Sequence, residues 1–426
     1  MDDHKEIGSS LGNNDSRWSD VDILRLLSDG ANAIGAGTPT DLGRSFTNQS
    51  SHSTPITLAG GIPDTGLLPT KDLQTALVEV LEQNPKGALE YGGVLGFEGL
   101  RSILAERQSL LEGLLVGSDS ILMNNGSAGS IDTICRAFIN PGDSVIVESP
   151  SFSGSLRTIQ GHQAKIHEVP VLSDGLAIKD LESMLQNLSS QGTNPKILYT
   201  IPDFHNPTGA TMSIEQRMEL IQICLKYKVL IVEDAAYSEI HFNADGFQSI
   251  YSLARGVGVL KVGTFSKSIA TGLRVGWIQA SPDLIASLSK MRFDMGSSPL
   301  LLRALHHYIS AGSLETHLAN MRPLYAKKCE ILCQTIAEHC SANLSFVQPQ
   351  GGFFLWVSCT GISSDTLAES AAQEGLVFPT GRNFFVGNHD GLPNHIRLAF
   401  SNATLEELSS VGPRLGRALS RASTNS

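Results

Sequence analysis

Between about residue 70 and residue 265, short apolar runs alternate with longer segments whose apolar residues recur every three or four positions. The first pattern is typical of buried strands, and the second is typical of helices that pack on one side. The apolar runs predict strands at 144–147, 197–201, 229–232 and 259–263. The longer segments predict helices at 73–82, 100–111, 130–138, 181–188 and 214–227. Because strands interleaved with helices form a mostly parallel sheet covered on both faces, the pattern predicts an α/β fold.

The C-terminal part of the chain has a different order of elements, in which strands and helices are grouped. A long helical stretch is predicted at 299–340. Strands are predicted at 353–357 and 395–400, and helices at 365–374 and 405–418. This grouping predicts a second, smaller α+β domain. The expected organisation begins with a disordered tail (1–19) and an N-terminal arm that packs with the small domain (20–75). A large ligand-binding domain (76–309) and the small domain (310–426) follow. The arm is expected to contain a short amphipathic helix at 21–27.

Composition and charge narrow the classes of function. Hydrophobic residues make up 41% of the 426 residues and charged residues 17%, as in ordinary globular proteins, and no apolar run reaches the length of a membrane span. The net charge of −11 argues against nucleic acid or an anionic membrane as the main partner. The N-terminus is polar and acidic, unlike a secretory signal, so a cytoplasmic location is expected.

Six cysteines are scattered along the chain without a Cys-x-x-Cys pair, which agrees with a reducing compartment. Cys329 and Cys333 lie one helical turn apart, and His339 and Cys340 follow. This spacing suits either a zinc site or the buried face of a helix. The sequence favours the helix face, and no metal site is predicted.

Polar and aromatic residues follow each of the four predicted strands. Phe152 comes after the first strand and Asn206 after the second. Asp234 and Tyr237 come after the third, and Lys267 follows the fourth. Because ligands of open α/β sheets bind outside the carboxyl ends of the strands, these five side chains are expected to meet at one site.

The segment around the lysine, GTFSKSIATGLRVGW at 263–277, also predicts an anion site. Thr264 and Ser266 supply hydroxyl groups, and Arg274 supplies a fixed positive charge. The segment NGSAGS at 125–130 opens a predicted helix, and the first backbone N–H groups of a helix bind phosphate. These residues together predict a phosphate-binding cup.

A phosphorylated pyridine aldehyde, pyridoxal 5'-phosphate, fits this set of residues. Lys267 is the amine that forms an imine with the aldehyde and later moves protons at the substrate α-carbon. Asp234 pairs with the ring nitrogen, and Phe152 stacks on the ring. Asn206 and Tyr237 contact the ring oxygen.

Each of these residues also has a more ordinary explanation when taken alone. A lone lysine is usually a solvated surface group, and Asn-Pro-Thr-Gly at 206–209 is usually a turn. Asp234 suits the N-cap of a following helix equally well. Arg397, in the segment HIRLAFS, suits either a surface ion pair or a fork for a substrate carboxylate. The joint order of all the motifs favours the cofactor site.

This order of motifs resembles the class I/II aminotransferases, a family of fold-type I pyridoxal-phosphate enzymes. The resemblance implies a large domain with a mostly parallel sheet between helices, and a smaller α+β domain. It runs from about residue 58 to about residue 401. Its most specific segments are LAGGIPD, YGGVLGFEGLR, NGSAGS, ESPSFSG, NPTG, EDAAY, TFSK, GLRVGW and IRLAFS. Within the family, the sequence is most similar to the branch of 2-aminoadipate, kynurenine and aromatic aminotransferases.

The resemblance implies a role for each matching position. Lys267 matches the Schiff-base lysine, Asp234 the partner of the pyridine nitrogen, and Arg397 the arginine that binds the α-carboxylate. The remaining positions match cofactor contacts: Ser127, Ala128, Phe152, Asn206, Tyr237, Thr264, Ser266 and Arg274.

Three further matches concern the substrate and a second subunit. Gly61 matches a glycine whose backbone lies beside the substrate. Tyr91 matches a tyrosine that reaches the phosphate of the neighbouring subunit, which implies a homodimer with shared active sites. Arg44 lies near the position of an arginine that meets acidic substrate side chains in the 2-aminoadipate branch, although its flanking residues match poorly.

The function predicted from the sequence is the transfer of an amino group between an α-amino acid, aromatic or 2-aminoadipate-like, and a 2-oxo acid. The same cofactor site also suits a decarboxylase, a lyase or a condensing enzyme, because the bond that breaks depends on how the substrate is held. Transcription regulators that fuse this fold to a DNA-binding domain are disfavoured. The residues before the LAGG segment show no basic helix-turn-helix pattern, and the chain is acidic.

Overall fold

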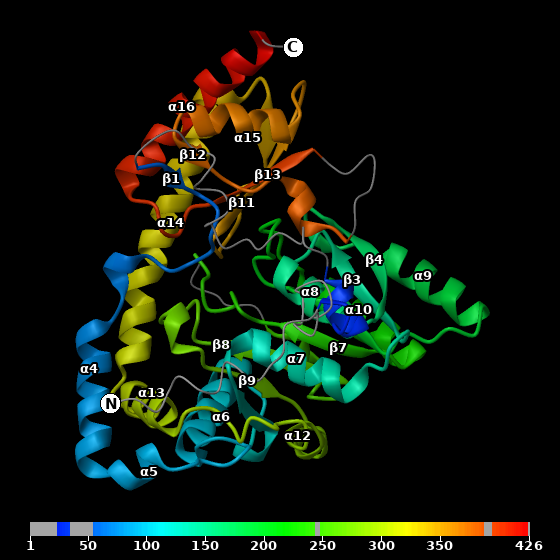
Figure 1. Cartoon of the computed structure of the whole chain (residues 1–426), viewed down its shortest axis with the longest axis vertical. Coiled ribbons are helices and arrows are strands. Elements are labelled where there is room, and N and C mark those ends of the chain that lie inside the picture. The colour runs from blue at the N-terminus through cyan, green and yellow to red at the C-terminus, as the bar shows by residue number, and fades with distance from the viewer. Residues whose placement is uncertain (1–23, 35–53, 243–247, 387–393, 425–426) are drawn as a thin grey trace, which may run out of the picture.

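A computed structural model describes residues 24–34, 54–242, 248–386 and 394–424 of the chain. Its centre is an eight-stranded sheet with the strand order β2-β9-β8-β7-β6-β3-β4-β5 (Figure 1). The strands from β8 to β4 run parallel, and β9, β2 and β5 pair antiparallel with their neighbours. The bounds are β2 Ile121–Asn124, β3 Ser144–Ser149, β4 Lys165–Leu172, β5 Gly175–Leu176, β6 Ile197–Thr200, β7 Leu230–Asp234, β8 Val259–Thr264 and β9 Gly276–Gln279.

Helices cover both faces of this sheet, as the continuous apolar runs of its strands require. One face packs against α7, α8 and α12, and the other packs against α6, α9, α10 and α13. Each face has its own cluster of buried side chains, so all six residues of β8 are buried. The helices of this part are α4 Thr70–Gln83, α5 Pro85–Leu89, α6 Glu98–Glu112, α7 Gly126–Phe138, α8 Ser153–Gly161, α9 Ile178–Ser190, α10 Ile214–Tyr227, α11 Ile250–Leu253, α12 Pro282–Ser289 and α13 Pro299–Ser310.

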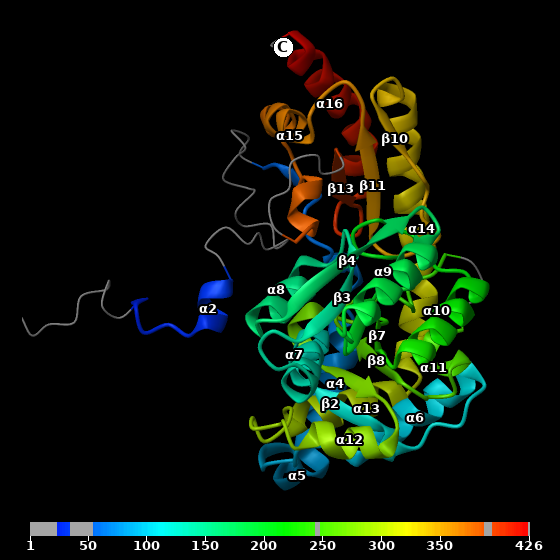
Figure 2. The same cartoon turned by 90° about the vertical axis from the view of Figure 1, so that its right-hand side faces the viewer.

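A smaller unit is built from the C-terminal residues and a short N-terminal strand (Figure 2). The antiparallel strands β10, β11 and β13 form a sheet, and β1 pairs in parallel with β12. Helices α14, α15 and α16 pack on these strands around a separate hydrophobic core. The bounds are β1 Ile56–Thr57, β10 Leu344–Phe346, β11 Phe354–Cys359, β12 Leu376–Val377, β13 His395–Ala399, α14 Ser313–Cys340, α15 Ser364–Gln373 and α16 Leu405–Thr424.

The α/β fold class is confirmed, and several local predictions need correction. The helical stretch predicted at 299–340 is two helices, because Gly312 adopts a left-handed conformation with φ +75° between α13 and α14. Helix α7 begins at Gly126, four residues before the predicted start. Asp234 does not cap a helix, because it ends β7 and a turn follows it. Of the helix predicted at 21–27, residues 21–23 lie outside the described residues, and residues 25–27 form a turn and irregular chain rather than a helix. The short helix α2 (Asp29–Ala33) follows.

Two expectations from composition can be compared with the structure. Within the described ranges, all six thiols are free and buried, and no cluster of His, Cys, Asp or Glu suits a metal ion. Cys329 and Cys333 lie on the buried face of α14, with their sulfur atoms 4.0 Å apart. No helix in the described part of the chain is both long enough and apolar enough to cross a membrane.

Candidate active site at the strand ends

The carboxyl ends of β7 and β8 place Asp234 and Lys267 at the same edge of the sheet. Lys267 Nζ donates a hydrogen bond to the carbonyl oxygen of Gly61, 2.7 Å away, and lies 5.6 Å from the centre of the Tyr237 ring. Gly61 follows β1 in the sequence, so the amine is held between the large sheet and the N-terminal strand segment. An amine in this position can act on a ligand bound above the strand ends.

Asp234 is buried and keeps two hydrogen-bond donors. The hydroxyl of Tyr199 donates to its Oδ2 at 2.7 Å, and the backbone N–H of Ala236 donates to its Oδ1 at 3.2 Å. Burial raises the pKa of Asp234 above its usual value, while these two bonds and the nearby charge of Lys267 act in the opposite direction. A carboxylate in this setting is suited to pair with a buried cationic group.

Hydroxyl groups and a guanidinium meet at the end of β8. Thr264 Oγ1 donates to Ser266 Oγ at 3.0 Å, and Arg274 Nη1 donates to the same oxygen at 3.4 Å. Arg274 Nη2 donates to the carbonyl of Asn125 at 3.4 Å, at the N-terminus of α7. The side chain of Asn125 does not cap α7 and instead donates to Asp294. The backbone N–H groups of the first turn, which contains Ser127 and Ala128, thus carry no side-chain cap, and this arrangement suits a phosphate group.

Two glycines allow Arg274 and α7 to approach each other closely. Gly126 has φ +77°, and a Cβ atom on it would lie 2.7 Å from Arg274 Nη2. A Cβ atom on Gly276 would lie 2.7 Å from the carbonyl carbon of Gly126. Any side chain at either position would therefore displace part of this cup.

Gly126→Ala is expected to weaken the binding of a phosphorylated ligand about tenfold, because a left-handed alanine costs roughly 1–2 kcal/mol and its methyl group displaces Arg274. The measurement is the dissociation constant of pyridoxal phosphate from the protein. Gly113→Ala is the control, since Gly113 also has a positive φ, at the end of α6, but has open space around its Cβ position. Equal losses of affinity in the two variants would contradict a phosphate site at Gly126.

Arg397 is buried on β13 and faces the strand ends. Its Nη1 donates to Asn206 Oδ1 at 2.8 Å, and its Nη2 donates to the carbonyl of Ala59. The guanidinium lies over the rings of Phe354 and Phe384, at 4.3 and 4.6 Å. This contact fixes a planar cation in a water-poor site, which suits bidentate binding of a carboxylate.

Gly61 connects the amine and the guanidinium. Its carbonyl accepts from Lys267, and a Cβ atom on it would lie 2.3 Å from Cζ of Phe354, the ring that supports Arg397. The predicted residues Lys267, Gly61 and Arg397 are thereby brought to one place.

The loop that carries Asn206 is anchored by a buried arginine. Arg217 donates to the carbonyls of Met212 and Pro202, at 3.0 and 3.3 Å, and forms an ion pair with Asp203. His205 Nδ1 lies 2.9 Å from the hydroxyl of Thr208. These contacts hold the Asn206 side chain against Arg397.

The remaining predicted residues are placed in three different ways. Phe152 precedes α8 and packs, partly buried, against the side chains of the same sheet face as Tyr199. Tyr91 is 86% exposed. Arg44 lies outside the described residues.

Sequence reasoning missed four residues of this site: Tyr199, Ala59, Phe354 and Phe384. Side chains alternate between the two faces along β6, and this alternation places Tyr199 on the same sheet face as Ile197. That pattern is the sequence signal that could have revealed Tyr199. The contacts of the other three residues depend on how the smaller unit packs on the large sheet, and no local pattern reveals this.

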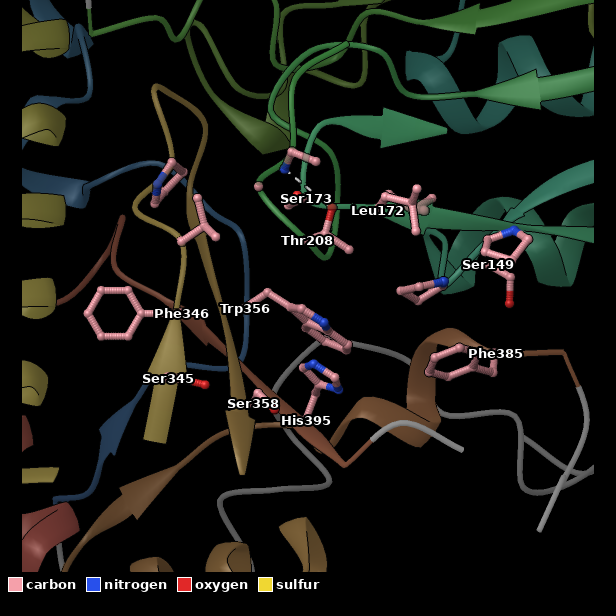
Figure 3. A pocket seen from close by; sticks show the side chains of 17 residues that line it. Ser149, Leu172, Ser173, Thr208, Ser345, Phe346, Trp356, Ser358, Phe385 and His395 are labelled. Atoms are coloured by element: carbon pink, nitrogen blue, oxygen red, sulfur yellow. Dashed lines mark hydrogen bonds between the residues drawn. The ribbon is translucent and has the colours of Figure 1, made fainter. Parts of the chain in front are cut away.

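A cavity of about 450 Å³ lies beside this site, between β10, β11 and the loop after β6 (Figure 3). Trp356 and His395 stack at 5.0 Å on one wall, and Thr208 and Ser149 lie on the opposite wall. The walls come from the large sheet and from the smaller unit, so the width of the cavity depends on how the two are placed.

The fold and this set of donors define a class of protein, the pyridoxal-phosphate enzymes with a large α/β domain. Residues 54–411 match the family model for aminotransferase class I and II. The chain belongs to this family.

Named relatives agree with this assignment. The chain is 31% identical over 356 residues to aromatic-amino-acid aminotransferase 1 of Thermococcus litoralis, covering 83% of this chain and 85% of the relative. It is 29% identical to the 2-aminoadipate transaminase of Thermus thermophilus, covering 85% of this chain and 90% of the relative. The fold matches the crystal structure of Pyrococcus horikoshii kynurenine aminotransferase with a TM-score of 0.86 at 29% identity. The match covers 94% of this chain and 98% of that structure. The protein is thus a pyridoxal-phosphate-dependent aminotransferase.

The geometry fits pyridoxal phosphate at each of its polar ends. The uncapped first turn of α7 and Arg274 suit the phosphate. Among the described residues, Tyr199 and Ala236 each donate one hydrogen bond to buried Asp234, which leaves acceptor capacity for a ring N–H. Lys267 supplies the amine.

Proposed function

We propose that the protein exchanges amino groups between an aromatic or 2-aminoadipate-like α-amino acid and a 2-oxo acid. The observation that carries the proposal is the buried guanidinium of Arg397, held by Asn206 and two aromatic rings and joined through Gly61 and Phe354 to the amine of Lys267. This arrangement supports binding of a substrate carboxylate near the amine. The substrate class is supported by the names of the relatives.

Lys267 is proposed to hold the cofactor and to move the proton at the substrate α-carbon. When bound, pyridoxal phosphate supplies a carbonyl that captures the amino group and a ring that accepts electrons. The amine of Lys267 needs a neutral state to accept a proton, and the adjacent carbonyl of Gly61 orients it. Tyr237, whose ring lies 5.6 Å away, is proposed to line the same space.

Asp234 is proposed to bind the cofactor at its ring nitrogen, and Asn206 and Tyr237 are proposed to bind it at the ring oxygen. Phe152 is proposed to lie against the ring. The phosphate is assigned to the N–H groups at Ser127 and Ala128 and to side chains at the end of β8: Thr264, Ser266 and Arg274. Arg397 is assigned to the substrate α-carboxylate and Gly61 to the backbone wall beside it.

The proposal includes a homodimer that works in the cytoplasm. Tyr91 is 86% exposed, and we assign it to the phosphate of the neighbouring subunit. The six free thiols agree with a reducing compartment. Arg44 is proposed as a contact for an acidic substrate side chain. The net charge of −11 gives no support for nucleic acid or an anionic membrane as a partner. The domain boundaries at 19, 75 and 309 remain predictions.

The test is the visible absorption spectrum of the purified protein, recorded before and after addition of each amino acid of a panel. Loss of the visible band with one amino acid, and its return with a 2-oxo acid, supports transamination and names the donor class. Release of carbon dioxide, or of a fragment of the substrate, without formation of pyridoxamine phosphate would favour a decarboxylase, lyase or condensing enzyme. A protein that pyridoxal phosphate does not colour would overturn the proposal.

A further inference from the structure

Tyr199 contacts Asp234, the residue assigned to the cofactor ring nitrogen. Its Cα pairs with that of Val232 in the register of β6 and β7, and Asp234 is two residues further along β7. Because side chains alternate along a strand, Asp234 projects from the same face as Val232, beside Tyr199. The phenol is fully buried, and its hydroxyl donates to Asp234 Oδ2 at 2.7 Å.

The phenol has polar neighbours on two sides. Tyr199 donates to Asp234, and the hydroxyl of Ser155 on α8 acts to lower the pKa of Tyr199. Burial, together with the charge of Asp234, holds the pKa of Tyr199 well above its usual value, so the phenol keeps its proton and remains a donor. Because Ser155 acts to lower the pKa of Tyr199, it makes the phenol a stronger donor to Asp234.

Donation to a carboxylate lowers its affinity for a proton. Two charged groups of the described residues also act on Asp234: Lys267 lowers this affinity, and Glu148 on β3 raises it. Ala236 supplies the second donor, on the opposite oxygen. Of these groups, Tyr199 donates to Asp234 through a side-chain hydroxyl. A substitution can remove this hydroxyl and leave the backbone unchanged.

We propose that Tyr199 is a positioning residue that keeps the proton shared by Asp234 and the cofactor on the ring nitrogen. The proposal rests on the proposed binding of the ring nitrogen by Asp234. Without the phenolic donor, the carboxylate becomes more basic and draws the proton toward itself. A hydrogen bond to a charged group corresponds to roughly a ten- to hundredfold change in this proton partition. The ring then accepts electrons less well.

The direct test is the ¹⁵N chemical shift of the ring nitrogen in holoenzyme prepared with ¹⁵N-labelled pyridoxal phosphate. In Tyr199→Phe the signal is expected to move toward that of an unprotonated pyridine. The ring of phenylalanine fills the same space, so packing alone does not predict this shift. Tyr308→Phe is the matched control, because Tyr308 on α13 is equally buried but donates to the carbonyl of Ser313, the first residue of α14.

Ser155→Ala provides a second variant that leaves the phenol in place. It is expected to move the ¹⁵N signal in the same direction as Tyr199→Phe but by a smaller amount. If Tyr199→Phe does not yield folded protein, the shift in Ser155→Ala decides the question. An unchanged signal in a folded Tyr199→Phe, or in Ser155→Ala when that is the only folded variant, overturns the proposal while leaving the aminotransferase function intact.

A second measurement follows cofactor retention as pH falls. Burial acts to raise the pKa of Asp234, and protonation of its carboxylate would remove the charge that pairs with the ring nitrogen. Loss of the Tyr199 donor raises this pKa further. Tyr199→Phe is therefore expected to release pyridoxal phosphate at a higher pH than the wild type and Tyr308→Phe. If the wild type itself binds no pyridoxal phosphate, the proposed function fails together with this inference.

Discussion

Replacing Lys267 with alanine is expected to lower kcat by roughly 10⁴-fold, at the upper end of the contribution of a positioned proton-transfer group. The variant loses the amine that holds the cofactor and that moves the substrate proton, and alanine offers neither group. Its fold is expected to persist, because Lys267 sits in a turn after β8 rather than in a core cluster. The measurement is a steady-state transamination assay together with the circular dichroism spectrum.

A covalent label distinguishes this role from a merely structural one. Borohydride treatment of the wild-type holoenzyme should fix the cofactor on a single peptide that contains Lys267, and mass spectrometry should find no such label in Lys267→Ala. Lys290→Ala, at the exposed end of α12, is the control and should retain both the label and the activity. Full activity in Lys267→Ala would overturn the central assignment.

The sequence was sufficient for those parts of the fold that depend on local patterns. Helix α10 was predicted at 214–227 and spans Ile214–Tyr227, because a capping box of Ser213 and Gln216 marks its start. The buried strands β3, β6, β7 and β8 gave apolar runs, and their bounds differ from prediction by at most two residues. The α/β class followed from their alternation with helices.

Strand β4 was not predicted, although it pairs with β3 along six positions. Of its eight residues, only Val169 is buried, so the strand lacks the apolar run that marked its neighbours. It lies near the edge of the sheet, next to the two-residue strand β5. Its place is set by pairing with β3, and a sequence pattern does not carry that information.

The same distinction applies to the candidate site. Asp234 and Lys267 were predicted because each follows an apolar run, and parallel strands end at one edge. The contact of Asp234 with Tyr199 was not predicted, because it depends on the register between β6 and β7. The aromatic support of Arg397 by Phe354 and Phe384 depends on the packing of separate segments.

Asp234→Asn is expected to lower kcat by roughly 10²–10³-fold, the usual effect of removing one preorganised electrostatic group. An amide carries no charge to pair with a protonated ring nitrogen, so the bound ring would accept electrons less well. The variant should also lose cofactor affinity. The measurement is the single-turnover rate at saturating pyridoxal phosphate, which separates chemistry from cofactor loss. Asp283→Asn, in the exposed first turn of α12, is the control.

The double variant Asp234→Asn/Tyr199→Phe tests whether the two residues act as one unit. If Tyr199 acts through Asp234, removing its hydroxyl matters in the wild type but adds little once the carboxylate is gone, because contacting residues in one hydrogen-bond network are not additive. A fully additive loss would show that Tyr199 supports the site by another route. A rate in Asp234→Asn within twofold of the wild type at full cofactor occupancy would remove Asp234 from the ring nitrogen. The charge partner of the cofactor would then have to be sought elsewhere at the strand ends.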